Sequence, residues 1–86
     1  MNLYLISQTV NNTWDTYDCA IVCASTPEAA RMIHPAQEKE WFTKPWDGKE
    51  EEYGSWANVE DVSVDFIGVA APDVAEGLVC VSSSRR

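Results

Sequence analysis

The chain offers few side chains that could carry out catalysis. Its single histidine, His34, stands at the expected end of a helix, where a positive imidazole would suit the helix dipole. Catalysis needs a base or nucleophile held beside partner groups. The sequence contains no phosphate-binding glycine loop, no Gly-x-Ser-x-Gly element and no Cys-x-x-Cys pair. We therefore predict no enzymatic activity, no catalytic residue and no cofactor.

The three cysteines, Cys19, Cys23 and Cys80, stand in apolar, strand-like runs, where cysteine behaves as a small hydrophobe. Cys19 and Cys23 lie four positions apart within one expected strand, so both point to the same face. A zinc site would have to add Cys80 and His34, and this spacing matches no zinc pattern. We predict no metal site and, because the cysteine number is odd, no disulfide framework.

Acidic and aromatic residues together suggest a binding surface. The run from Asp47 to Glu50 does not alternate oxygen ligands as a calcium loop does. Residues 35–58 combine aromatic side chains, which often anchor protein interfaces, with acids that suit a cationic partner. Alternatively, the indoles pack over the sheet as part of a small core. The predicted partner-binding residues are Trp41, Trp46, Asp47, Glu50, Glu51, Glu52, Tyr53, Trp56, Asp15 and Asp18.

Four apolar runs predict the strands that must position these residues. Residues 3–7 and 17–24 predict an antiparallel hairpin, and the uninterrupted second run is typical of a central strand covered on both faces. Residues 62–66 alternate apolar and polar side chains and the apolar run continues to residue 70, which predicts a third strand with a bulge at Gly68. Residues 78–81 predict a final strand at an edge of the sheet.

A short helix is expected between the second and third strands. Ser25 or Thr26 can cap its first turn, and Glu28 can close a capping box with Ser25. The helix is expected to run about two to three turns, because Pro35 disfavours helical geometry in the residue before it. An extension of the helix through residues 35–42 stays open.

The predicted fold is a single α+β domain over residues 1–86. It has a small, mainly antiparallel sheet in the order β-β-α-loop-β-β, with one short helix packed on one face. Residues 35–58 form a long Trp-rich, acidic connection, and residues 82–86 form a polar tail. A chain of 86 residues has room for one small core.

The charge of the chain restricts its partners. The chain has fourteen acidic and six basic residues, which gives a formal net charge of −8. Two of the basic residues, Arg85 and Arg86, are the last two of the sequence. Such a surface repels nucleic acid phosphates and anionic membranes, so we predict neither as a direct partner. A protein with a basic surface is electrostatically suited. The N-terminus has no signal-peptide pattern and no run approaches a membrane span, so we predict a cytosolic location.

The opening of the chain carries a resemblance. Residues 3–8 read LYLISQ, residues 15–22 read DTYDCAIV, and Ala29, Arg31, Ile33, His34 and Pro35 follow. This pattern resembles a group of small, uncharacterised proteins encoded by bacteriophages and prophages. The likeness continues through the Trp-rich middle and the strands at 62–67 and 77–81. The group has no settled activity, so no functional residue carries over, but the resemblance implies a phage accessory protein in the cytosol of a bacterial host.

Binding to a host protein is the function that we expect. Small acidic phage proteins often block host proteins, including nucleic-acid-binding defence complexes, which is an analogy of type and not of fold. One alternative is a self-assembling or structural phage protein, a homodimer formed through the edge strand at 78–81. Another is a small-ligand-binding module with a cleft between helix, sheet and Trp-rich loop.

Overall fold

The computed structural model describes residues 1–11, 16–36, 46–49 and 56–83. Most of the predicted connection 35–58, of the open extension 35–42 and of the tail 82–86 lies outside these residues. Within them the predicted α+β class and element order are confirmed. The elements are β1 (Asn2–Ser7), β2 (Tyr17–Ala24), α1 (Pro27–Arg31), the 3₁₀ turn η1 (Val59–Asp61), β3 (Ser63–Val69) and β4 (Gly77–Ser83).

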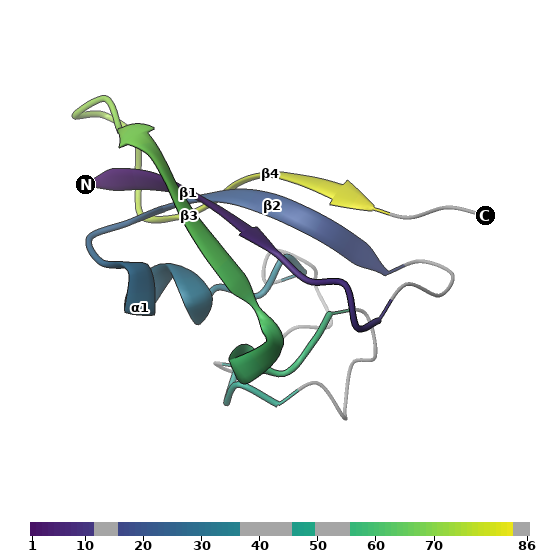
Figure 1. Cartoon of the computed structure of the whole chain (residues 1–86). Helices are drawn as coiled ribbons and strands as arrows, with labels where there is room; N and C mark the ends of the chain where they lie inside the picture. The colour runs from purple at the N-terminus through teal and green to yellow at the C-terminus, as the bar shows by residue number, and fades with distance from the viewer. Residues whose placement is uncertain (12–15, 37–45, 50–55, 84–86) are drawn as a thin grey trace.

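The four strands form one antiparallel sheet in the order β3-β1-β2-β4 (Figure 1). The predicted hairpin of β1 and β2 makes the centre of the sheet, because β3 and β4 add to its two outer sides. The prediction of a central strand at 17–24 and an edge strand at 78–81 is therefore confirmed. The edge strand is longer than predicted: it runs from Gly77 to Ser83, so it includes the first two residues of the predicted polar tail 82–86.

The helix starts as predicted but is shorter. The hydroxyl of Thr26 accepts a hydrogen bond from the amide of Ala29 at 3.1 Å, so Thr26 is the N-cap. A capping box between Ser25 and Glu28 would need Ser25 in that position, and this prediction is wrong. After Arg31 the next two amides donate to carbonyls three residues back, both at 3.2 Å. These tighter turns replace the predicted continuation of the α-helix.

The core lies between the sheet and α1, which packs against β1, β2 and β3 on one side of the sheet (Figure 1). Alternate residues of the two central strands point into it, as the period of two in a strand requires. We call this side of the sheet the helix side. The core cluster consists of Tyr4, Ile6, Ala20, Val22, Ala24, Ala30, Ile33, Trp46, Trp56 and Val62.

Both edge strands contain a β-bulge near the same level of the sheet. In β3 the register shifts between Phe66 and Gly68, which leaves Ile67 as the extra residue and confirms the predicted bulge at Gly68. In β4 the register shifts between Leu78 and Cys80, which leaves Val79 as the extra residue. A bulge leaves a residue unpaired and bends its strand. Neither edge therefore presents a regular ladder of backbone groups.

Candidate interaction surface

The two described tryptophans from the predicted binding set belong to the core. Trp46 is 7% exposed and Trp56 is fully buried. The indole Nε1 of Trp46 donates to the carbonyl of Lys49 at 2.9 Å, and its ring meets the imidazole of His34 edge to face at 5.2 Å. Buried indoles present no area to a partner. The alternative of core packing therefore describes Trp46 and Trp56.

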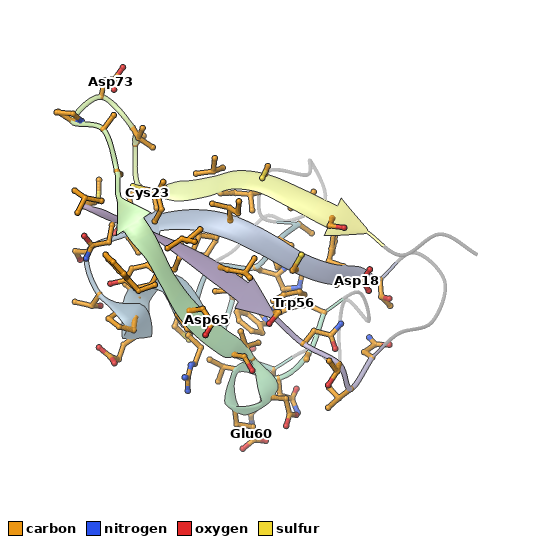
Figure 2. All side chains as sticks on the ribbon, turned by 45° about the horizontal axis from the view of Figure 1, so that its top comes forward. Asp18, Cys23, Trp56, Glu60, Asp65 and Asp73 are labelled. Atoms are coloured by element: carbon orange, nitrogen blue, oxygen red, sulfur yellow. The ribbon has the colours of Figure 1, made fainter. Side chains whose placement is uncertain are left out.

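The described acids of the predicted set do not come together. Asp18 is exposed at the start of β2, whereas Asp47 lines the same pocket as Glu60 of η1, and Figure 2 shows Glu60 well apart from Asp18. An Oδ1 atom of Asp47 accepts from the amide of Lys49 at 3.0 Å, which closes a local turn. Six predicted residues lie outside the described part of the chain, namely Asp15, Trp41, Glu50, Glu51, Glu52 and Tyr53.

One described pocket bears on the ligand-binding alternative. It has a volume of about 230 Å³ and is lined by Asp47, Gly48, Lys49, Asn58, Val59 and Glu60. Ligand pockets usually enclose about 300–1,000 Å³ and are mainly apolar. This pocket is smaller than that range and mostly polar or charged. It gives no specific reason to prefer a small ligand.

His34 has a structural position that differs from the predicted helix end. Its side chain is 1% exposed, and its Nδ1 accepts a hydrogen bond from the amide of Ala36 at 3.0 Å. The ring therefore contacts the backbone of the turn after α1, which ends at Arg31, and does not lie at the helix end that the sequence suggested. The three cysteines are free thiols in the sheet, and no three potential metal ligands come together among the described residues.

The side of the sheet opposite α1 is a more coherent surface, which we call the open face. Directly opposed residues of neighbouring strands point to the same side, so the pairing places three rows across β3, β1, β2 and β4. The rows are Gly68-Leu3-Cys23-Gly77, Asp65-Leu5-Ile21-Cys80 and Ser63-Ser7-Cys19-Ser82. The central strands thus supply the large apolar side chains, and the edge strands supply small or polar ones.

Most of the open face is accessible. Leu3, Leu5 and Ile21 are partly exposed, although each is a large apolar residue on a central strand. Only Cys23 is fully buried there, and its thiol lies 3.8 Å from the carbonyl oxygen of Val74 in the connection between β3 and β4. That connection covers one end of the face, and no other described segment lies over it (Figure 1). The predicted cover on both faces of β2 is therefore incomplete among the described residues.

The charge of this layer has a single sign. The four strands and the connection from β3 to β4 contain no lysine or arginine. Asp65 belongs to the middle row of the open face, and Asp73 and Glu76 lie in the connection at its end. Figure 2 shows Asp65 on β3 and Asp73 at the tip of this connection. The open face therefore combines large apolar side chains with serine and cysteine, and every charged side chain described on it or at its end is acidic.

Sequence reasoning directed attention to the aromatic segment and missed the open face. The available signal was β1 itself, in which Leu3 and Leu5 alternate with the core residues Tyr4 and Ile6. A strand that is apolar on both sides is expected to be covered on both sides. The chain has one five-residue α-helix among its described residues, which covers the helix side only.

Comparisons with known proteins do not add a functional assignment. No family model matches the chain, and no curated protein or solved structure matches it either. Among the described residues, no helix has the length and apolar character needed to cross a bilayer. Function must therefore be inferred from the surface.

Proposed function

We propose that this protein acts by non-enzymatic binding to a partner protein that has a basic surface. The open face carries the proposal, because it combines accessible apolar side chains with carboxylates and no lysine or arginine. Covering apolar area stabilises a complex by roughly 25 cal/mol per Å², before the costs of association. The carboxylates attract a basic partner and disfavour direct contact with nucleic acid.

The proposed setting is the cytosol of a bacterial host, where the chain acts as a phage accessory protein. Support comes from the sequence resemblance to phage and prophage proteins and from the net charge of −8. A counter-defence role follows from the same charge. An acidic protein can occupy the basic surface by which a defence complex holds nucleic acid, and it then inhibits the complex by competition. This mechanism requires neither a catalytic residue nor a cofactor.

Salt-dependent capture from a bacterial lysate tests this function. The full chain is immobilised, host proteins are bound at low salt and released at high salt, and an enriched protein is purified for affinity measurement. We expect a basic host protein whose Kd weakens about tenfold or more between about 0.05 and 0.3 M salt, because salt screens exposed charges. An unrelated protein of similar acidic charge is the control. Enrichment no greater than that control, or a Kd independent of salt, contradicts the proposal.

Self-assembly through β4 is the alternative with some structural support. β4 is an edge strand, and Val79 and Val81 on it are exposed. The bulge at Val79 interrupts the edge, however, and two copies would each bring a net charge of −8. Light scattering over a series of protein concentrations separates the two functions. A molar mass equal to that of the monomer at every concentration would exclude the dimer as the functional form.

A further inference from the structure

Gly68 occupies an interior position of β3 where the described chain does not require glycine. Its φ is outside the left-handed region, whereas Gly77 has a φ of 127° that favours glycine. A Cβ atom added to Gly68 would meet no atom within 4 Å. Glycine weakens a strand, and its presence there often marks a bulge, such as the one beside Gly68, or the close approach of a ligand or another backbone. The space beside Gly68 on the open face is therefore available to a second molecule.

The form of the partner follows from the edges of the sheet. An added strand needs a regular ladder of free backbone groups, and both edge strands are interrupted by the bulges at Ile67 and Val79. The face of a sheet is instead covered by a helix or by another sheet. In this protein the helix side is already covered by α1, so a helix on the open face would complete a three-layer arrangement.

The chemistry of the partner follows from the charge. The strands hold the acids Asp18 and Asp65 and no base, so the open faces of two copies would repel each other. A cationic segment meets only attraction at Asp65 and at the acids of the β3–β4 connection. The partly exposed side chains of Leu3, Leu5 and Ile21 require apolar side chains opposite them. A segment with both properties is an amphipathic helix with a basic polar side.

We propose that a basic amphipathic α-helix of the partner lies across the open face and passes closest to the sheet at Gly68. Its apolar stripe covers Leu3, Leu5 and Ile21, and its lysines or arginines lie beside Asp65. This inference rests on the proposed function, and it specifies both the surface used and the form of the partner that is recognised.

A synthetic peptide can serve as the probe. The peptide places leucines at positions i, i+3, i+4 and i+7 to form one stripe and fills the other positions with lysine. A second peptide with glutamate in place of lysine is its control. Affinity for the full chain is measured by fluorescence anisotropy, and the contact surface is mapped by amide NMR shifts. We expect the lysine peptide alone to bind, with the largest shifts at Leu3, Leu5 and Gly68 and small shifts in α1.

Neighbouring residues of β3 provide a matched pair of variants. Gly68→Thr adds a side chain to the open face, and Val69→Thr introduces the same residue next to it on the helix side, where Val69 is opposite Asn2. Threonine favours strands, so both variants are expected to fold, which circular dichroism checks. We expect Gly68→Thr to weaken peptide binding by about tenfold or more and Val69→Thr to change it by less than about twofold.

A second matched pair tests the charge contact. Asp65→Asn removes a carboxylate from the open face, and Glu28→Gln removes an exposed carboxylate from α1. We expect only Asp65→Asn to weaken the binding of the lysine peptide, by about threefold to tenfold in Kd. The same substitution should reduce the salt dependence of that Kd. Equal effects of the two substitutions would overturn the proposed position of the basic side chains.

The results separate this inference from the proposed function. One outcome is salt-sensitive peptide binding whose Kd is unchanged by Gly68→Thr, or whose largest amide shifts fall on α1 and Val69. That result overturns docking on the open face but still supports a basic partner. Absence of peptide binding also overturns the helix inference, whereas the lysate capture decides the proposed function independently. Loss of binding in Gly68→Thr, with Val69→Thr unchanged, supports the inference.

Discussion

Three polar side chains are buried among the described residues, namely Gln8, Thr16 and His34. A buried polar group needs hydrogen bonds to replace those it made to water. His34 accepts from the backbone of Ala36 through Nδ1, and its ring also packs against Trp46. The histidine that sequence analysis had placed at a helix end thus stabilises the turn after the helix. Its role is structural.

Replacement of His34 tests this role. We expect His34→Ala to lower the free energy of unfolding by about 2–4 kcal/mol, because it removes both the acceptor and the ring contact. His34→Asn keeps an acceptor near the position of Nδ1 and should recover about 1 kcal/mol of that loss. Urea unfolding of the three proteins at one pH measures the difference. Equal stability of the alanine and asparagine variants would show that the bond to Ala36 contributes little.

Gln8 closes the end of the β1–β2 hairpin with three hydrogen bonds. Its Nε2 donates to the carbonyls of Asn11 and Tyr17 at 2.7 and 2.8 Å, and its Oε1 accepts from the amide of Asn11 at 2.8 Å. Leucine is similar in size to glutamine, so the Gln8→Leu variant keeps the volume of the side chain but makes none of these hydrogen bonds. We expect it to lower the unfolding free energy by about 2–4 kcal/mol, measured by urea denaturation. A Thr9→Leu variant, changed at an exposed neighbour, is the control; similar losses in both would contradict this role.

At the scale of the elements, the start of α1 gives a sharp test. Thr26 accepts the amide hydrogen bond of Ala29, whereas Ser25 precedes the cap. We expect Thr26→Ala to lower the unfolding free energy by about 1 kcal/mol and Ser25→Ala to lower it by less than about 0.3 kcal/mol. Thermal unfolding by circular dichroism measures both. A larger loss in Ser25→Ala would show that the cap has been assigned to the wrong hydroxyl.

Local signals explain which elements could be predicted from the sequence. Alternation and apolar runs revealed all four strands, and a hydroxyl residue followed by Pro27 located the start of the helix. These patterns could be read because they act within a few residues. The end of the helix could not be predicted, since Met32 and Ile33 are residue types that a helix accepts, whereas the helix ends at Arg31 and tertiary packing places Ile33 in the core. Which of Ser25 and Thr26 is the N-cap also depends on the backbone geometry, and the sequence allows either residue in that position.

The open face depends on contacts between distant parts of the chain. Gly68 and Leu3 become neighbours only because β3 pairs with β1, and Cys80 meets Ile21 only because β4 pairs with β2. No local pattern specifies that sheet order. The buried positions of Trp46 and Trp56 are likewise set by long-range packing, so composition suggested a binding role as readily as a core role.

At the scale of the whole molecule, an excess of acids opposes the compact state. The chain has fourteen acidic and six basic residues, and the uncompensated carboxylates repel one another more when the chain is folded than when it is extended. We expect Tm to rise by about 2–5 °C when sodium chloride increases from about 0.01 to 0.2 M, because the screening length shortens. Differential scanning calorimetry measures this shift. Chloride is used since sulfate stabilises proteins by exclusion from their surface. An unchanged or lower Tm would contradict net repulsion.

The single charge sign of the sheet layer also affects how the protein meets its partner. Arg31 in α1 and Lys49 beside Trp46 lie outside the strands, close in sequence to the acids Glu28 and Asp47. Both charge signs therefore occur on the helix side, whereas the strands carry acids and no lysine or arginine. A cationic protein that reaches the strands meets carboxylates without a neighbouring lysine or arginine, which favours encounters at the open face. Local attraction of this kind would raise the rate at which a small surface is found.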